Sequence, residues 1–308
     1  MITGGAGFIG ANLAREFVGL GIETAVIDDF STGYRANLDG VAVDLHEGSI
    51  LDAELLRRAA EGAETIVHLA ARGSVPRSLV DPVATHEVNA TGTLNVLEAA
   101  RTVGAQVIFA SSSSVYGSNP AIPKHEQLAC APMSPYAASK LAAESYVLAY
   151  QQSYGVPALA FRFFNVYGPL QAADHAYAAV VPRFVSAVLR QEPVTIYGDG
   201  LQTRDFTSVK SVTSVITDAV KRRVASPTPV NLAFGTRTSI LDLLGMVAAI
   251  TGIPSTARHE ASRTGDVRDS QADSARLHEL FPSAHRESLE DGLAATIAWF
   301  QSVASAVR

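Results

Sequence analysis

Cysteine is almost absent from this chain of 308 residues, and the single copy, Cys130, cannot form an internal disulfide. One cysteine also excludes a zinc site built from several thiolates. The eight histidines show no HExxH or other paired metal-ligand spacing, so we expect no metal. We interpret Cys130 as a small apolar residue, which suits a reducing cytoplasm.

Long apolar runs and basic stretches are missing too. No run approaches the roughly 18 apolar residues of a membrane span, and the opening MITGGAGFIG lacks the basic region and apolar core of a signal peptide. The 24 Lys and Arg are scattered, and the net charge of −6 would repel a phosphate backbone. We therefore expect a cytoplasmic protein that binds neither a membrane nor nucleic acid.

The first half of the chain alternates short β-branched runs with helical patterns. We predict strands at residues 24–28, 41–46, 65–70, 106–110 and 158–163. Apolar residues at three- and four-residue steps predict helices at residues 9–19, 53–61, 83–103 and 135–154. This alternation is typical of an α/β fold with a doubly wound, parallel Rossmann-type sheet.

The pattern loosens after Phe164. Helices are predicted at residues 181–189, 241–251 and 289–302, with short strands between them. We predict a dinucleotide-binding domain at residues 1–165 and a smaller α/β substrate lobe at residues 166–308, with some of its chain crossing back to the first domain. The cleft between the two is the expected reaction site.

Glycines at positions 4, 7 and 10 open the chain at a strand-to-helix turn, where backbone N–H groups can approach a pyrophosphate. Only Met1 and Ile2 precede Thr3, so either the true start lies upstream or the first strand is clipped. The next strand ends at Asp28, whose carboxylate would accept hydrogen bonds from an adenosine ribose and repel a 2′-phosphate. NAD is therefore favoured over NADP, although Arg35 in the next loop leaves NADP open.

Tyr136 and Lys140 lie four residues apart, on one face of a helix whose start is marked by Ser134-Pro135. An apolar strand before them leads into four serines, 111–114, which puts hydroxyls at the carboxyl end of the sheet. A base near neutrality needs a Tyr pKa lowered by roughly three units, or about 4 kcal/mol. An ammonium roughly 4 Å away supplies about that much at an effective dielectric near 20. Tyr136 is thus the predicted base.

Ser112, Tyr136 and Lys140, in that order, resemble the catalytic set of short-chain dehydrogenases/reductases, as does the spacing of Gly4, Gly7 and Gly10. Motifs along almost the whole chain extend the resemblance to UDP-hexose 4-epimerases of the extended type: His68-Leu-Ala-Ala, Asn89-Ala-Thr-Gly-Thr, Arg162-Phe-Phe-Asn-Val-Tyr-Gly-Pro, Gly198-Asp-Gly-Leu-Gln-Thr-Arg-Asp-Phe and Arg263-Thr-Gly-Asp-Val-Arg. The resemblance implies that bound NAD oxidises C4 of the sugar, that the 4-keto sugar rotates, and that hydride returns to its other face.

The resemblance also implies the two binding sites. The cofactor residues would be Gly4, Gly7, Phe8, Ile9, Asp28, Asp29, Ser31, Thr32, Gly33, Ser49, Ile50, Leu69, Ala70, Ala71, Asn89, Tyr136, Lys140 and Phe163. The substrate residues would be Val75, Ser112, Ser113, Tyr136, Asn165, Val180, Tyr197, Arg204, Arg263, Asp266 and Ser270. Tyr197 would stack on uracil, and Asp266 would bind the uridine ribose. Asn165, Arg204 and Arg263 would hold the diphosphate, since an arginine fork can pair with two phosphate oxygens.

Sister activities of the family are distinguished by a few positions. Dehydratases carry two carboxylates where this chain has Ser113 and Ser114, and UDP-glucuronate decarboxylases carry one at the second position, so both activities are disfavoured. UDP-glucuronate 4-epimerases usually have Thr in place of Asn165 and an Arg where this chain has Leu170-Gln171-Ala172. A UDP-glucuronate 4-epimerase, a nucleotide-4-ketosugar reductase and a non-catalytic NAD-binding protein remain as alternatives.

Two further expectations follow from the resemblance. Some relatives have a large Tyr in place of Ser270, so this chain has room for an N-acetyl group, and residues 72–78 resemble the UDP-N-acetylglucosamine 4-epimerase branch. Activity on both plain and N-acetylated sugars is the leading hypothesis. The helices at residues 83–103 and 135–154 would pack against their copies in a homodimer.

Overall fold

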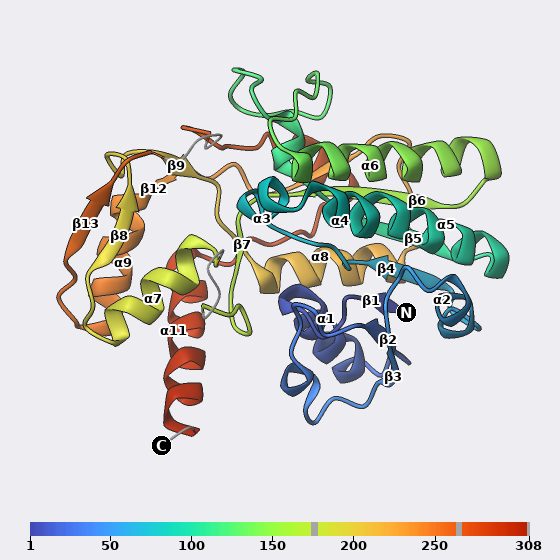
Figure 1. Ribbon diagram of the computed structural model, residues 1–308, viewed down its shortest axis with the longest axis horizontal. Coiled ribbons are helices and arrows are strands. Elements are labelled where there is room, and N and C mark those ends of the chain that lie inside the picture. The colour runs from blue at the N-terminus through green and yellow to red at the C-terminus, as the bar shows by residue number, and fades with distance from the viewer. Residues whose placement is uncertain (174–177, 263–266, 307–308) are drawn as a thin grey trace.

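One parallel sheet organises the larger part of the molecule. The computed structural model describes residues 1–173, 178–262 and 267–306, with side chains described as far as Val303. Seven strands follow the order β11-β6-β5-β4-β1-β2-β3, and helices cover both faces (Figure 1). This confirms the doubly wound α/β fold. Within the described residues, no helix is long and apolar enough to cross a membrane.

The predicted strands and helices of the first half are present with small shifts at their ends. The sheet strands are β1 (Ile2–Thr3), β2 (Ala25–Asp28), β3 (Asp44–Glu47), β4 (Thr65–His68), β5 (Gln106–Ser112), β6 (Ala158–Phe163) and β11 (Val230–Leu232). The helices are α1 (Phe8–Gly19), α2 (Ala53–Ala59), α3 (Val75–Val80), α4 (Pro82–His86), α5 (Gly92–Val103) and α6 (Pro135–Tyr154).

The helix predicted at residues 83–103 is interrupted by a π-helical turn, Glu87–Thr91, between α4 and α5. Asn89 lies in this turn. Its side chain accepts a hydrogen bond from the N–H of Arg72 (2.7 Å) and donates to the hydroxyl of Ser139 (3.0 Å) on α6. The side-chain amide of Asn89 thus connects the π-helical turn to the segment at Arg72 and to α6. Turns of this kind are frequent at functional sites.

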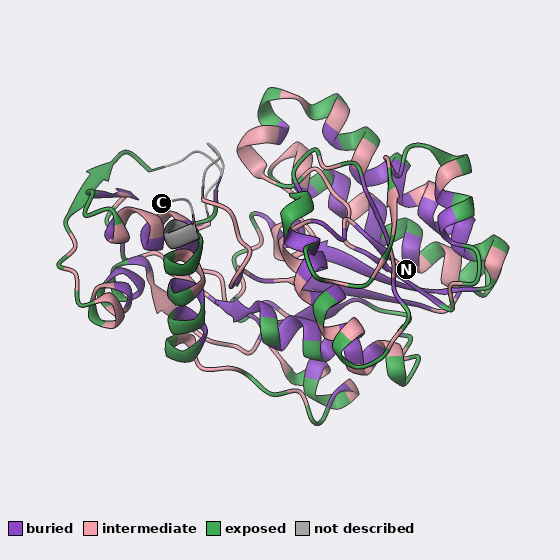
Figure 2. Ribbon diagram, turned by 90° about the horizontal axis from the view of Figure 1, so that it is seen from below, coloured by how far each residue is buried: buried purple, intermediate pink, exposed green. Residues whose placement is uncertain are grey.

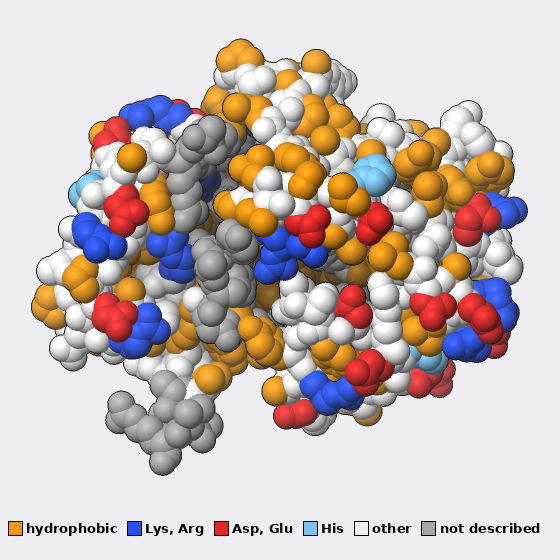
Figure 3. All heavy atoms as spheres, in the orientation of Figure 1, with side chains coloured by type: hydrophobic (Ala, Val, Ile, Leu, Met, Phe, Trp, Pro, Cys, Tyr) orange, Lys and Arg blue, Asp and Glu red, His pale blue; other side chains and the backbone are white. Residues whose placement is uncertain are grey.

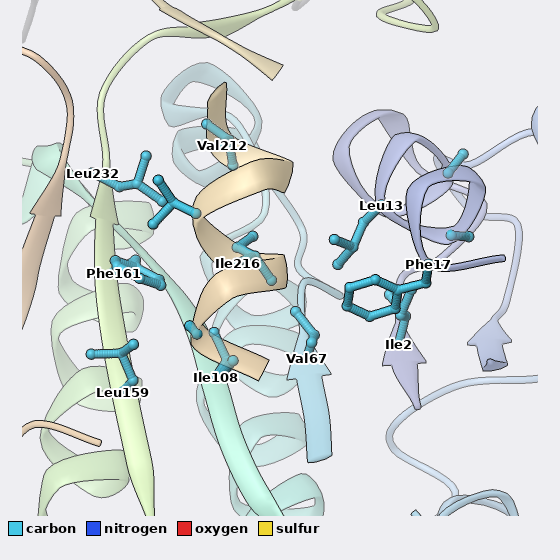
Figure 4. Close-up of a cluster of buried hydrophobic side chains, with 14 of the residues drawn as sticks. Ile2, Leu13, Phe17, Val67, Ile108, Leu159, Phe161, Val212, Ile216 and Leu232 are labelled. Carbon is cyan, nitrogen blue, oxygen red and sulfur yellow. The ribbon is translucent and has the colours of Figure 1, made fainter. Parts of the chain in front are cut away.

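Apolar side chains on both faces of the sheet form the core. On one face, Leu13 and Phe17 of α1 and Ile216 of α8 (Val209–Lys221) pack over strand residues such as Ile108 and Phe161 (Figure 4). On the other face, helices α2, α5 and α6 cover the strands. Figure 2 shows the buried residues following the strands, with exposed residues on the outer sides of the helices. Helix α8 was not predicted, and it comes from the second half of the chain.

The second half also forms a smaller lobe with its own core of buried residues. Its helices are α7 (Val180–Leu189), α9 (Ile240–Thr251) and α11 (Leu289–Ala306), whereas Leu277 of α10 (Ala275–Leu280) is buried in the core of the large sheet. Three strand pairs accompany them: β7 (Val166–Tyr167) with β10 (Thr207–Ser208), β8 (Val194–Tyr197) with β13 (Ala257–Glu260), and β9 (Thr203–Arg204) with β12 (Thr238–Ser239). Helix α8 and strand β11 return to the large sheet, so a domain boundary at residue 165 stays a prediction.

A buried ion pair joins α6 to the sheet. Glu144 of α6 accepts from the guanidinium of Arg162 on β6 at 2.6 and 3.0 Å, and the Ser111 hydroxyl on β5 donates to the same carboxylate at 2.6 Å. The two charged side chains are 3% and 4% exposed. Two charges this far from water must remain in contact, because each would otherwise be buried and unpaired.

Replacement of Glu144 by Ala should therefore lower the free energy of unfolding by roughly 3–5 kcal/mol, since it leaves the Arg162 charge buried alone. Chemical denaturation of the two proteins measures the difference. Glu61→Ala is the matched control, because Glu61, which follows α2, forms an exposed ion pair with Arg57 of that helix (3.2 Å). There we expect a change within about 0.5 kcal/mol. A loss at Glu144 as small as that of the control would contradict the prediction.

Candidate active site

The first strand ends in a glycine-rich turn that leads directly into α1. Gly4 has φ +69°, and a Cβ built on it would lie 2.7 Å from the backbone nitrogen of Ala70, just after β4. Only glycine lets two backbone segments come this close. Helix α1 begins at Phe8, so its positive N-terminal end borders the turn. The strand order reverses here, between β1 and β4, and this is where Rossmann-type folds bind dinucleotides.

Asp28, at the end of β2, holds the turn from one side. One oxygen of its buried carboxylate accepts from the N–H of Ala6 (2.9 Å), and the other accepts from the N–H of Phe30 (2.8 Å). Burial raises the pKa of Asp28, while these hydrogen bonds act in the opposite direction. A carboxylate has about four acceptor positions, so Asp28 can still accept ribose hydroxyls. The Arg35 guanidinium is already paired with Glu47, which favours NAD over NADP.

Two cavities, of about 480 and 500 Å³, meet at the glycine-rich turn. The first, which we call the adenosine cavity, is lined by these predicted cofactor residues: Gly4, Gly7, Asp28, Asp29, Ser31, Thr32, Ser49, Ile50, Leu69, Ala70 and Ala71. The second, the catalytic cavity, adds Phe8, Ile9, Ser112, Tyr136, Lys140 and Phe163. Both are lined by Gly4, Gly7 and Thr32, so together they form a continuous path that fits the two halves of a dinucleotide.

Two predicted cofactor residues, Gly33 and Asn89, do not line either cavity. A Cβ on Gly33 would lie 2.8 Å from the carbonyl carbon of Ala6, so Gly33 packs directly against the turn. The side chain of Asn89 is committed to Arg72 and Ser139, as described above. Gly33 therefore contributes by packing against the backbone of the glycine-rich turn, and Asn89 contributes by its hydrogen bonds to Arg72 and Ser139.

Ser112, Tyr136 and Lys140 come together at one wall of the catalytic cavity. The Ser112 hydroxyl lies at the end of β5 and accepts from the Ser114 hydroxyl (2.8 Å). It is also hydrogen-bonded to Tyr136. The ammonium of Lys140 donates to the carbonyl of Ala110 (2.9 Å). Helix α6 carries the tyrosine and lysine on one face, as their spacing predicts.

The pKa of Tyr136 differs from the prediction. Burial raises the pKa of this phenol, and the hydrogen bond with Ser112 only partly opposes the effect. The expected lowering by Lys140 is wrong for this structure, where the ammonium is engaged with the Ala110 carbonyl and its own pKa is lowered by burial to about 8. Lys140 is nevertheless mostly protonated at neutral pH, so a positive charge remains beside the reaction site.

A third cavity, of about 420 Å³, is the substrate cavity, which is lined by residues of the smaller lobe and by Ser74, Val75 and Pro76 at the start of α3. Five predicted substrate residues line it: Val75, Asn165, Val180, Tyr197 and Arg204. Ser74, Val166, Gln171 and Ala179 line both this cavity and the catalytic one. The nucleotide end of a UDP-sugar would therefore have its own compartment next to the reacting groups.

Other predicted substrate residues are placed differently. Ser113 and Ser270 line none of these three cavities. The backbone N–H of Ser270 donates to the carbonyl of Thr203 (3.1 Å), beside Arg204. Arg263 and Asp266 lie outside the described residues.

Three arginines outside the predicted site also line the cavities: Arg72, Arg77 and Arg183. Arg183 of α7 lines the substrate cavity, with its guanidinium 5.6 Å from the ring centre of Tyr197. Arg77 of α3 lines both the adenosine and the catalytic cavity. Arg77 lies in the segment 72–78, whose resemblance to the UDP-N-acetylglucosamine 4-epimerase branch gave its side chain no role. For Arg183, the apolar pattern of α7 is the signal that indicates which residues share its face of the helix.

Comparison with known proteins agrees with this geometry. Residues 1–233 match the model of the NAD dependent epimerase/dehydratase family. This chain belongs to that family. A UDP-glucose 4-epimerase of Mycolicibacterium smegmatis is 35% identical to it over 98% of both chains. A UDP-N-acetyl-alpha-D-glucosaminuronate decarboxylase of Bacillus cytotoxicus is 32% identical, also over 98% of both. Family members of different specificity are thus about equally similar.

Solved structures of proteins that act on different UDP-sugars are also about equally similar to this chain. UDP-glucose 4-epimerase of Thermotoga maritima, with UDP-glucose, has a TM-score of 0.93 and 32% identity over 98% of both chains. UDP-N-acetylglucosamine 4-epimerase of Methanobrevibacter ruminantium has a TM-score of 0.93 and 33% identity, covering 98% of this chain and 97% of that one. UDP-glucuronic acid 4-epimerase of Bacillus cereus, with UDP-glucuronic acid and NAD, has 0.90 and 28% over 98% of both. The chain is an NAD-dependent enzyme of this family that acts on UDP-sugars.

The role of the glycine-rich turn in NAD binding can be tested by substitution. A Cβ on Gly10 would fall on the carbonyl oxygen of Gly4, so Gly10→Ala should displace the turn and weaken NAD binding by at least about tenfold. The control is Gly19→Ala at the other end of α1, where a Cβ meets nothing within 4 Å. NAD titration of both variants measures the difference, and equal affinity of Gly10→Ala and wild type would contradict the role of the turn.

Proposed function

We propose that this enzyme catalyses the 4-epimerisation of a UDP-hexose. The observation that carries the proposal is the composition of the reaction site. Among the described residues, the catalytic and substrate cavities are lined by no Asp or Glu, and Tyr136 bonded to Ser112 is the group placed for proton transfer. Dehydration needs a further acid and base, and the side chains lining this site do not supply a carboxylate for either role.

The proposed mechanism assigns one role to each side chain. Tyr136 takes the proton of the sugar 4-hydroxyl, while Ser112 holds the same oxygen by a hydrogen bond. Lys140, on the same wall of the catalytic cavity, would anchor the nicotinamide ribose. Bound NAD would supply the hydride acceptor and donor for C4.

Inversion at C4 requires that the sugar turns over between the two steps. The substrate cavity supports this, because Asn165, Tyr197 and Arg204 line a compartment separate from the catalytic wall. A UDP group held there would keep the sugar attached while its ring rotates about the link to the diphosphate. In this proposal the smaller lobe binds the nucleotide and the larger domain carries out the chemistry.

The sugar is proposed to be glucose or galactose, with the N-acetylated forms also accepted. The catalytic cavity is lined by Gly73 and Ser74 on one side and by the uncharged segment Leu170–Ala172 on another. Small residues leave room for an acetamide, and the uncharged segment lacks a partner for a uronate. The proposed role of Ser270 in this choice stays a prediction, since Ser270 lines neither cavity.

We also propose a homodimer formed through α4, α5 and α6. Large apolar side chains are exposed on this part of the surface: Val83 is 66% exposed, and Tyr146 and Tyr154 are 43% and 58% exposed. Figure 3 shows hydrophobic side chains gathered on the upper part of one face, where Figure 1 places the green loop that precedes α6, with α3 and the start of α6 below it. Contiguous exposed apolar side chains are typical of an interface between subunits.

The activity is tested by incubating the purified protein separately with UDP-galactose and UDP-N-acetylgalactosamine and following the 4-epimers by chromatography. We expect conversion, and we expect Tyr136→Phe to lower kcat by about 10²- to 10⁴-fold because the proton-transfer group is lost. Tyr146→Phe, an exposed tyrosine on the same helix, should retain the wild-type rate.

Other outcomes would favour the alternatives. Consumption of NADH in proportion to product would indicate a ketosugar reductase, since an epimerase regenerates its cofactor in each turnover. No conversion even after addition of NAD would favour a non-catalytic NAD-binding protein. A third incubation uses UDP-glucuronate, and conversion of this substrate alone would favour the glucuronate epimerase.

The dimer is tested by light scattering after gel filtration at micromolar protein concentration. We expect twice the chain mass for the wild type and a monomer for Tyr146→Glu, because a charge in an apolar interface is costly to bury. Leu20→Glu, an exposed residue just after α1, is the control and should remain dimeric. A monomeric wild type would overturn the proposal.

A further inference from the structure

One short segment, Gly73–Arg77, borders all three cavities. Gly73, Ser74 and Arg77 line the catalytic cavity, and Ser74, Val75 and Pro76 line the substrate cavity. Arg77 also lines the adenosine cavity. Figure 1 shows α3, which contains most of this segment, at the border between the large sheet and the smaller lobe. The binding sites of the cofactor and of the UDP-sugar therefore share one stretch of backbone.

Hydrogen bonds make this segment a compact unit. The Ser74 hydroxyl accepts from the N–H of Arg77 (3.3 Å), and the Ser78 hydroxyl donates to the carbonyl of Val75 (2.7 Å). Ser74 has φ +101°, a backbone conformation that residues other than glycine rarely adopt. A force that moves Arg77 would therefore also move Ser74 and Val75, which form the wall of the substrate cavity.

The charge of Arg77 suits the middle of a dinucleotide. Arg77 lines both cofactor cavities, as do Gly4 and Gly7, whose turn would lie along the pyrophosphate. An arginine fork can bind two phosphate oxygens at once.

We propose that Arg77 binds the pyrophosphate of NAD from the side opposite the glycine-rich turn, and that it thereby couples NAD binding to UDP binding. With Arg77 anchored on the phosphates, Ser74 to Pro76 are held in the shape that the substrate cavity requires. Coupling of this kind is reciprocal, so UDP must tighten the binding of NAD by the same factor by which NAD tightens the binding of UDP.

Equilibrium dialysis of the full-length protein against graded NAD, with and without saturating UDP, tests the coupling. In the wild type we expect UDP to lower the Kd for NAD. In Arg77→Met we expect the Kd for NAD to rise about tenfold or more, as for the loss of a charged hydrogen bond, and we expect UDP to have no further effect on it. Arg77→Lys keeps the charge without the fork and should retain part of the affinity.

Two controls separate this role from a general loss of structure. Arg57→Met removes an exposed arginine of α2 that pairs with Glu61 (3.2 Å) and lines none of the three cavities, so it should leave both affinities unchanged. Arg77→Met should bind UDP in the absence of NAD as well as the wild type does. Unchanged NAD affinity in Arg77→Met would overturn the proposal, as would a UDP effect on NAD binding that persists in that variant. If Arg77→Met does not fold, wild-type affinity and coupling in Arg77→Lys would overturn the role of the fork.

Discussion

The geometry of the active site depends on the buried ion pair between Glu144 and Arg162. Tyr136, Lys140 and Glu144 follow one another at four-residue steps along α6, so they share one face of the helix. The same carboxylate accepts from Ser111, the neighbour of Ser112 on β5. Contact between two buried charges is demanding in distance and direction. The pair therefore sets how α6 lies on the sheet, and with it the position of the phenol relative to the serine.

A second buried polar chain links the glycine-rich turn to the same helix. Thr3 accepts from the N–H of Ala70 and lies 2.7 Å from Nδ1 of His68, while Nε2 of His68 lies 3.0 Å from the hydroxyl of Thr93. That hydroxyl donates to the carbonyl of Asn89, so the bonding pattern assigns the proton to Nε2. Burial, with a smaller effect of Lys140, lowers the pKa of His68 to about 3. The histidine thus remains neutral and acts as a fixed connector between strands and helices.

The sequence predicted the elements whose pattern agrees with their packing, and it missed those where tertiary contacts override local preference. Helix α8 is rich in Val, Thr and Ile, which favour strands, yet its apolar residues at three- and four-residue steps are buried against the sheet. The glycine-rich turn and the Tyr136/Lys140 spacing were recognisable because they are local. Arg77 and the π-turn at Asn89 were not, because their meaning depends on segments brought together by the fold. The raised pKa of Tyr136 likewise reflects burial, which spacing does not reveal.

The return of β11 and α8 to the large sheet limits how this enzyme can change during evolution. Strand β11 covers the edge of β6, and α8 covers apolar residues such as Phe161. A lobe inserted or exchanged as a whole would uncover that edge and that core, and an unpaired strand edge favours aggregation. New substrate preferences can therefore arise more readily through single substitutions and loop changes around the substrate cavity than through domain exchange. This constraint fits a family in which relatives of different specificity align with this chain over 98% of their length.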